Sequence, residues 1–270
     1  RRNTKATDSS NNKATGRKPL SHILSPYASM ISPLLLLAAW QIIAQAGLVA
    51  PEVLVPPLGV WQAFCELLES GDLAMHLGNS LWRLTVGFSI GAAIGLVLGS
   101  AMGASRQVQA YVNPLFQFIR PLPTVALIPA FVMFFGVGET IKLVLVAKAT
   151  ALLITLATFE AVKGIPRTWL EVAAVYKAPP LTLLFRVILP ATVPPVLTGL
   201  RLALGRSWMV LVAAELLVSE NGLGQMMEHG RQMFRLDIVM VCVVLTGVIG
   251  WSLDRAVRAL EWQLVRWQHR

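Results

Sequence analysis

Long apolar blocks with almost no charged residues dominate this sequence. Hydrophobic residues make up 55% of the 270 residues and charged residues only 14%, whereas soluble domains carry about 25% charged residues. The blocks are about as long as a helix must be to cross a hydrocarbon layer of ~30 Å. The sequence therefore predicts an all-α, polytopic membrane protein with six transmembrane helices, centred near residues 31–49, 84–102, 115–135, 141–159, 196–217 and 238–253.

The third of these spans carries four prolines, Pro114, Pro121, Pro123 and Pro129. Prolines persist in a spanning helix only where neighbouring protein or water satisfies the backbone carbonyl groups that they leave free. We therefore expect this span to be broken, and to be buried against other helices.

Basic residues are distributed unevenly between the segments that join the spans. With a cytoplasmic N-terminus, most of the 23 Lys and Arg residues fall on cytoplasmic segments, and the outer segments keep only Lys142, Arg231 and Arg235. Basic residues near span ends resist translocation, so both termini are predicted to be cytoplasmic, in a bacterial inner membrane. Residues 1–28 are expected to form a disordered basic cytoplasmic tail, and residues 29–268 the transmembrane domain.

Residues 49–80 contain four acidic residues and no Lys or Arg, which places them outside under the same rule. Within them, residues 58–69 are predicted to form a short amphipathic helix. Its apolar face suits the membrane interface and consists of Trp61, Phe64, Leu67 and Leu68.

Several function classes find no support in the residues. The basic residues follow the topology instead of forming one patch with interleaved aromatic residues, which argues against nucleic-acid binding. The chain has no G-x-x-x-x-G-K-[ST] phosphate loop, so we expect no catalytic residue and no cofactor here, and any ATP chemistry in a separate subunit. Its two cysteines, Cys65 and Cys242, are too few for a disulfide framework or a metal cluster.

Five glycines recur every four residues in the second span. This spacing aligns them roughly along one face of a helix, where small residues let two membrane helices approach closely. We interpret this face as a helix-packing surface, made of Gly87, Gly91, Gly95, Gly99 and Gly103.

A polar, proline-rich segment of mixed charge interrupts the apolar blocks at about residues 163–190. Its core reads EVAAVYKAPPLTLLFRVILP. A short helix is predicted over residues 168–175, in which Ala173 and Ala174 offer a small apolar knob and Glu171 a charge on the N-terminal side.

This segment resembles the cytoplasmic coupling loop with which the permeases of ABC importers bind their ATPases. That loop reads E-A-A, with a Gly six residues after the Glu and an apolar-x-Leu-Pro ending. The positions of this chain that correspond to the loop, with Lys in place of the Gly, are Glu171, Ala173, Ala174, Lys177, Ile188, Leu189 and Pro190.

The resemblance extends over about residues 30–268. Beside the loop, it rests on the order and spacing of HLGNSLWRLTVGFSIGAAIGLVLG, RPLPTVALIPAFVMFFGVGET, GLRLALGRSWMVLVAAELL and GLGQMMEHGRQMFRLDIVM. These segments are similar to the permease subunits of nitrate, sulfonate, taurine and bicarbonate ABC importers. The resemblance implies the type I ABC importer permease fold, with residues 29–268 as the permease domain.

The family also implies partners and a cargo. Besides the lipid bilayer, the expected partners are a second copy of the chain, two cytoplasmic ABC ATPases that hold ATP and Mg²⁺, and an extracytoplasmic substrate-binding protein. The expected cargo is a small anion, a sulfonate or taurine-like molecule first, with nitrate and bicarbonate as alternatives. A second interpretation is a membrane scaffold or channel that is no longer coupled to an ATPase.

Lys177 is the residue that favours this second interpretation. A Gly at its position would adopt a left-handed turn without strain, whereas Lys would lose about 1–2 kcal/mol in the same geometry. Either Pro179 and Pro180 rebuild the turn after Ala178, or the loop fits a correspondingly altered ATPase groove.

Charged residues inside the spans are candidates for the translocation pathway, because a charge at a helix centre costs about 2.5–3.5 kcal/mol and usually faces protein or water. For the arginines, snorkelling or ion pairing at the interface is an equal alternative. Lys148 lies too deep to snorkel easily, and Glu160 and Glu215 are its candidate resting partners. The candidates are Arg83, Lys148, Arg201, Arg206 and Glu215.

Overall fold

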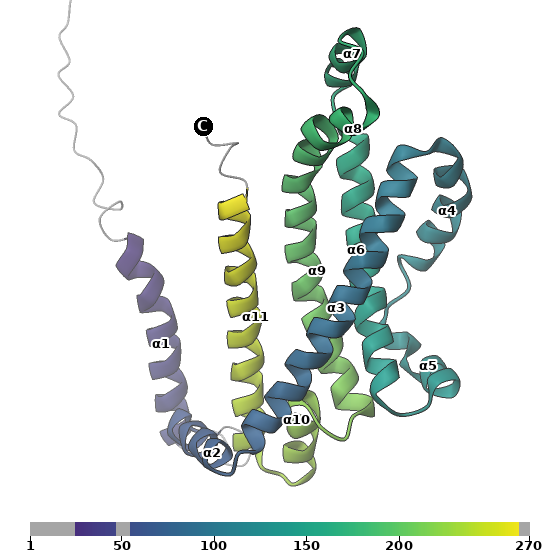
Figure 1. The fold of residues 1–270 in the computed structure, drawn as a ribbon. Coiled ribbons are helices and arrows are strands. Elements are labelled where there is room, and N and C mark those ends of the chain that lie inside the picture. Colours follow the sequence, from purple (N-terminus) through teal and green to yellow (C-terminus); the bar gives the residue numbers. More distant parts are fainter. Residues whose placement is uncertain (1–24, 47–54, 265–270) are drawn as a thin grey trace, which may run out of the picture.

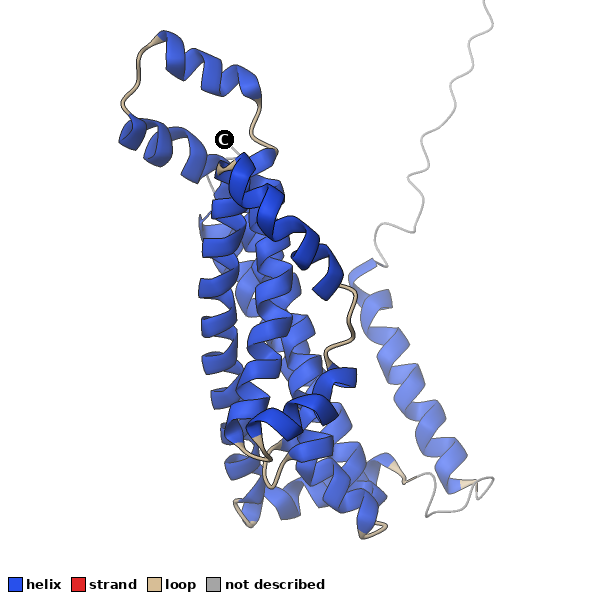
Figure 2. Cartoon of the chain, turned by 90° about the vertical axis from the view of Figure 1, so that its right-hand side faces the viewer, coloured by secondary structure: helices blue, strands red, loops and turns tan. Residues whose placement is uncertain are grey.

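The computed structural model describes residues 25–46 and 55–264, and every regular element in these residues is helical (Figures 1 and 2). In chain order the elements are α1 (Ser25–Gln45), α2 (Pro57–Glu69), α3 (Asp72–Ala104), α4 (Arg106–Ile119), the 3₁₀ turn η2 (Val125–Leu127), α5 (Ile128–Phe135), α6 (Glu139–Lys163), α7 (Arg167–Val175), α8 (Pro180–Leu183), the π-helical turn η3 (Leu184–Ile188), α9 (Leu189–Val218), α10 (Leu223–Gln232) and α11 (Leu236–Leu264).

Four of the described helices are long and apolar enough to cross a membrane. They are α3, α6, the continuous stretch Leu181–Val218 that contains α9, and α11, which correspond to the second, fourth, fifth and sixth predicted spans. The described residues do not confirm the predicted count of six. The first predicted span extends beyond α1 into residues 47–54, which lie outside the described residues, and the described side chains of α1 form the apolar stretch Leu35–Gln45.

The third predicted span is broken, as expected. α4 ends at Ile119 and a turn follows, and the chain resumes as η2 and α5. The expectation that this region is buried against other helices is wrong for the single chain. α4 and α5 lie at the edge of the bundle (Figure 1), so Leu115, Phe118, Met133 and Phe134 are 62–88% exposed.

α3 and α6 form the closest helix pair of the fold. Along the glycine face of α3, each glycine lies so near to α6 that an added Cβ would come within 2.4–2.8 Å of it. The atoms met belong to Val146, Ala147, Ile154, Thr155 and Val162. The predicted packing face is thus turned toward α6 over almost its whole length.

The two ends of the bundle differ in character. α7 projects beyond the other helices at one end, and α2, α5 and α10 lie at the other (Figure 1); we call these the α7 end and the α10 end. The described chain begins at Ser25 and stops at Leu264 on the side of the α7 end. Most of the predicted tail, residues 1–28, lies outside the described residues, but Ser25–Ala28 already belong to α1.

α1 stands apart from the rest of the bundle in both views (Figures 1 and 2), and α2 connects to it at the α10 end. The predicted amphipathic helix 58–69 is present as α2. Its predicted apolar face is divided: Leu67 is buried and Phe64 packs against the core, while Trp61 and Leu68 are more than half exposed.

Replacement of Gly95 by Leu should separate α3 from α6, because a Cβ there would lie 2.8 Å from the Cβ of Ile154 and 2.9 Å from the carbonyl oxygen of Ala151. Overpacking of this kind costs about 1–3 kcal/mol or more, so the thermal unfolding temperature of the purified protein should fall. Val97→Leu, at a 69% exposed position of the same helix, is the control. Equal unfolding temperatures for the two variants would contradict the close contact.

Cys65 on α2 tests the orientation of the chain. Its side chain is partly exposed, whereas Cys242 is buried. If the α10 end faces outward, an impermeant thiol reagent should label Cys65 in intact cells, and Cys65→Ser should abolish the signal. Labelling that appears only in inside-out vesicles would reverse the predicted topology.

Candidate functional site

The predicted coupling loop is the part of the chain that projects farthest at the α7 end. α7 begins at Arg167, one residue before the predicted start, and ends at Val175 as predicted. Glu171 is the fifth residue of this helix and is exposed, so the expectation of a charge on the N-terminal side is wrong. Its position in the middle of the helix presents the carboxylate to the surroundings, not to the helix dipole.

Apolar side chains cover the same projecting helix. Val175 and Tyr176 are about four-fifths exposed, and Trp169 and Val172 about half exposed. Ala174 is exposed beside them and Ala173 is partly buried. An exposed apolar patch with a central charge is typical of a protein-interaction surface.

Lys177 adopts the left-handed conformation itself, with φ 50°. The amide of Lys177 donates to the carbonyl of Ala174 (3.0 Å), and that of Ala178 to Ala173 (3.0 Å), which is the Schellman arrangement that a Gly usually ends. The alternative in which the prolines rebuild the turn is therefore wrong. The turn keeps its form at a strain of about 1–2 kcal/mol.

The end of the loop returns the chain to the membrane helices. η3 is a single π-helical turn that stops at Ile188, and α9 starts at Leu189 with Pro190 in its first turn. Pro190 cannot donate a backbone hydrogen bond, which is tolerated at that position. α7 is thus joined through short connections to α6 on one side and to α9 on the other.

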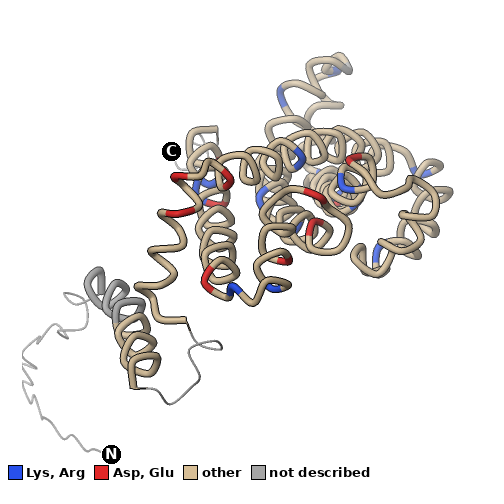
Figure 3. The backbone as a smooth tube through the Cα atoms, turned by 90° about the horizontal axis from the view of Figure 1, so that it is seen from below, with Lys and Arg blue, Asp and Glu red and all other residues tan. Residues whose placement is uncertain are grey.

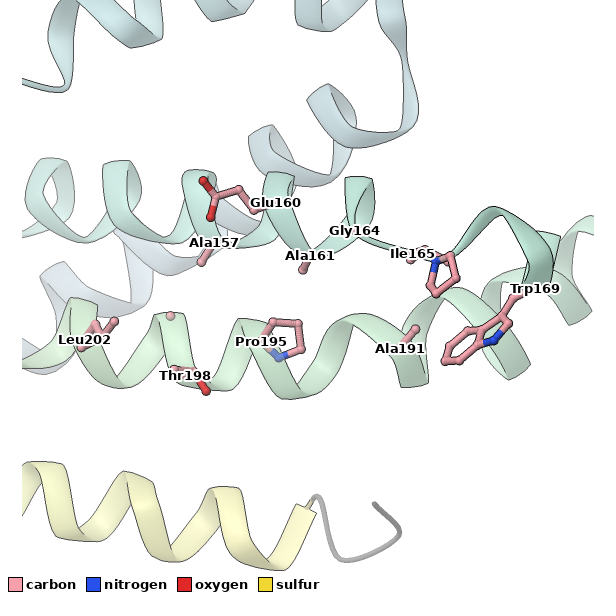
Figure 4. A pocket seen from close by; sticks show the side chains of 12 residues that line it. Ala157, Glu160, Ala161, Gly164, Ile165, Trp169, Ala191, Pro195, Thr198 and Leu202 are labelled. Atoms are coloured by element: carbon pink, nitrogen blue, oxygen red, sulfur yellow. The ribbon is translucent and has the colours of Figure 1, made fainter. Parts of the chain in front are cut away.

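A cavity of about 450 Å³ separates α6 from α9 at the α7 end (Figure 4). Its walls are mostly small residues, and the indole of Trp169 from α7 lies at its end. The same two helices touch at Gly199, where an added Cβ would lie 2.3 Å from the Cβ of Ala157. The other lining residues are Glu160, Ala161, Gly164, Ile165, Pro166, Ala191, Pro195, Thr198 and Leu202.

A largely buried cluster of charges lies at the α10 end. Arg83 donates to both carboxylate oxygens of Glu139, at 2.6 and 2.7 Å, and to Oε1 of Glu215 at 2.8 Å. It also donates to the backbone carbonyl of Asn221 (2.7 Å) and to the side-chain oxygen of that residue. Bidentate arginine–carboxylate pairs of this kind are among the strongest hydrogen-bonded contacts in proteins.

Neutral groups and one lysine complete the cluster. Ser80 Oγ donates to Glu215 at 2.8 Å, and the amide of Gly224 donates to the same carboxylate at 3.2 Å. Lys142 Nζ donates to Glu139 at 2.8 Å and to Ser219 Oγ at 3.0 Å. The exposed fractions are 2% for Arg83, 3% for Lys142 and 0% for Glu215, against 49% for Glu139.

Two of the predicted pathway charges, Arg83 and Glu215, form an ion pair in the structure. The sequence alone predicts them as separate candidates. Glu139 and Lys142 were missed as members. The count of basic residues assigned Lys142 to an outer loop. The sequence signal that could have revealed the pair is the spacing of Glu139 and Lys142, an acidic and a basic residue three apart at the start of a helix.

The remaining candidates do not join the cluster. Arg201 lies against α11, 3.3 Å from Glu261 and 3.7 Å from Asp254. Arg206 is exposed, without an ion pair inside the described part of the chain. Figure 3, seen from the α10 end, shows basic and acidic positions spread over many helices and not in one basic patch.

Lys148 lies partly buried on α6 and faces the connection between α4 and α5. Its Nζ lies 3.4 Å from the carbonyl oxygen of Leu122 and 3.3 Å from Thr124 Oγ1. The expectation that Glu160 or Glu215 is its resting partner is wrong, because Glu160 lines the cavity at the α7 end and Glu215 is held by Arg83. Its contacts are neutral oxygens.

Further ion pairs at the α10 end join α2 to the segment between α10 and α11. Arg235, between α10 and α11, donates to Glu66 of α2 at 2.8 Å and to Asp237 at 2.7 Å. The hydrogen bond and the positive charge of Arg235 lower the pKa of Glu66. Within the described residues, no group of three or more His, Cys, Asp or Glu could hold a metal ion.

Known proteins are similar in sequence to this chain over most of its length. The family described as "Binding-protein-dependent transport system inner membrane component" matches residues 91–265. Proteins named "Putative aliphatic sulfonates transport permease protein SsuC" are 34% identical in Bacillus subtilis, over 96% of this chain and 94% of theirs, and 36% identical in Escherichia coli, over 92% and 95%. The taurine transport system permease protein TauC of Escherichia coli is 32% identical over 86% of each chain.

The fold also matches a solved structure. A chain of the MetNI methionine ABC transporter in an inward-facing conformation superposes with a TM-score of 0.54 at 21% identity, over 67% of this chain and 92% of that one. The predicted resemblance to nitrate, sulfonate, taurine and bicarbonate importer permeases is confirmed. The chain belongs to the family of binding-protein-dependent transport system inner membrane components, the permeases of ABC importers.

Proposed function

We propose that this permease translocates a small anion, a sulfonate or taurine-like molecule, that an extracytoplasmic binding protein delivers. Relatives named for the transport of sulfonates, taurine and bicarbonate support this cargo class. Two copies of the chain would form the pathway, and two separate ATPases would supply ATP and Mg²⁺. The chain itself would carry out no chemistry.

The observation that carries the proposal is the projecting helix α7. It exposes apolar side chains around Glu171, and short connections join it to α6 and α9. An ATPase bound to α7 would therefore act on both helices at once. We assign the α7 end to the cytoplasm, which agrees with the distribution of Lys and Arg and leaves the α10 end for the binding protein.

The mechanism follows from the contacts between α6 and α9. They touch at Ala157 and Gly199 and line the open cavity from there toward α7. When ATP binding brings the two ATPases together, α7 moves with them. The helices α6 and α9 then approach each other, and the cavity between them becomes smaller. The alternative of an uncoupled scaffold rested on Lys177, and the left-handed conformation of this lysine, which is the one expected of a Gly at its position, supports the coupled function instead.

Lys148 would serve the cargo within this pathway. An anion that leaves water needs compensating charge, because burial of an unpaired charge is costly. Among its described contacts Lys148 has neutral acceptors and no carboxylate. Its ammonium is thus free to interact with an anion in transit.

Glu171→Lys should uncouple ATP hydrolysis from transport while the chain still inserts into the membrane, because the substitution reverses the charge at the centre of the ATPase-facing surface. The measurement is transport-coupled ATPase activity in proteoliposomes. Glu69→Lys makes the same charge change at an exposed position of α2 and should have no such effect. Full coupling in the Glu171 variant would refute the assignment of α7.

Lys148→Met keeps most of the side-chain stem and removes the charge. A hydrogen bond to a charged group contributes about 1.5–3 kcal/mol, so uptake of an anionic substrate should fall about tenfold or more, while the assembled complex and its basal ATPase activity persist. Arg106→Met, which also removes a positive charge, at an exposed position at the start of α4, is the control. Unaltered uptake of the anion in the Lys148 variant would remove this residue from the pathway.

A further inference from the structure

The buried charges at the α10 end join two parts of the permease that have different internal contacts. The first part is the helix pair α3 and α6, held together along the glycine face. The second is α9, residues 219–222 and α10. Here an added Cβ on Gly224 would lie 2.4 Å from the carbonyl of Val212 and 2.7 Å from the Cβ of Glu215, so α10 is packed tightly on α9.

The charges are divided between these parts in a simple way. Arg83, Lys142 and Glu139 all belong to α3 and α6, where they leave one positive charge in excess. Glu215 belongs to α9 and is the acidic partner from the second part. One ion pair, Arg83–Glu215, therefore crosses between the parts.

The other polar contacts that cross, among the described residues, are hydrogen bonds with a neutral partner on at least one side. Ser80 Oγ of α3 donates to Glu215 and accepts from the amide of Leu223 at 3.0 Å. Lys142 donates to Ser219, and Arg83 to the carbonyl of Asn221. Such contacts can be exchanged for water when the two parts separate, at a net change that is small for the neutral pair and larger for those with a charged donor or acceptor.

We propose that the Arg83–Glu215 pair is a releasable latch that holds the α10 end closed, and that Glu139 is the counter-ion that keeps Arg83 paired when the latch opens. This inference rests on the proposed function, since only a transporter must open this end to accept its cargo. In the structure the Arg83–Glu215 pair joins the two parts at the α10 end, whereas an open cavity lies between α6 and α9 at the α7 end.

The role of Glu139 follows from what each charge retains after separation. Arg83 keeps its bidentate contact with Glu139, which is on the same rigid pair. Glu215 keeps the amide of Gly224 and gains water from the opened surface. Without Glu139, release would leave two buried cations uncompensated, which is strongly unfavourable. Glu139 therefore lowers the free energy needed to separate Arg83 from Glu215, although it belongs to the same cluster.

A buried thiol at Leu223 can report on the latch. Leu223 is 0% exposed and its amide contacts Ser80 across the two parts, and Cys242, also 0% exposed, serves as an internal control for general loosening. In the full-length chain carrying Cys65→Ser and Leu223→Cys, peptide mass spectrometry would compare thiol labelling at positions 223 and 242 within one molecule.

Two near-isosteric substitutions should then act differently. Glu215→Gln removes the crossing ion pair and should raise labelling at position 223 about tenfold relative to position 242, because losing one member of a buried pair is strongly destabilising. Glu139→Gln should not raise this ratio, since it increases the positive charge that faces Glu215. A purely structural cluster would be loosened by both. An unchanged ratio in Glu215→Gln, or an equal increase in both variants, would overturn the latch.

The release step is tested in the complex with its ATPase, trapped with ATP and vanadate in nanodiscs. Trapping should increase labelling at position 223 several-fold in the parent chain, and Glu139→Gln should reduce that increase. A trapped complex that shows no increase would overturn release during the cycle. If no ATPase copurifies, the proposed function fails instead, and the comparison of Glu215→Gln with Glu139→Gln still decides whether the ion pair closes this end.

Discussion

The contact between α3 and α6 is the interaction on which the rest of the structure depends. Without a hydrophobic effect between helices in lipid, association relies on close packing of small residues. The glycine face of α3 lets the backbone of α6 approach until no Cβ would fit. This contact fixes Arg83 beside Glu139 and Lys142, and it provides a firm surface against which α9 can shift.

The same low-polarity surroundings explain why the charges of the α10 end are so fully paired. A buried charge that loses its partner costs several kcal/mol, so Arg83 is surrounded by two carboxylates and an asparagine, and Glu215 by a serine and a backbone amide. Lys148 differs because its described contacts are neutral oxygens. This contrast separates the charges that hold the fold together from the one that remains available for a ligand.

Sequence periodicity predicted those features that depend on one helix at a time. The glycine spacing, the broken third span and the short helix α7 all follow from local residue patterns. Contacts between helices were harder to predict. Glu215 pairs with Arg83, which is 132 residues away in the sequence, and no local pattern links the two residues. Lys177 illustrates the converse limit, because residue preference argued against a left-handed turn that the hydrogen bonds around Ala173 and Ala174 impose.

The chemistry of the two ends suits reciprocal movement. At the α7 end, the facing walls carry small side chains such as Ala161 and Pro195, with Glu160 as the one charged residue among those that line the cavity, so few bulky groups separate α6 from α9 there. At the α10 end, closure is held by directional hydrogen bonds that are either made or broken. In the proposed mechanism, the contact between Ala157 and Gly199 acts as a pivot, so that closing the cavity would separate α9 from α6 at the α10 end. The proposed function needs two arrangements, one with the α7 end open and one with the α10 end open, and the gap at one end and the polar contact at the other would give each a different physical means of closure.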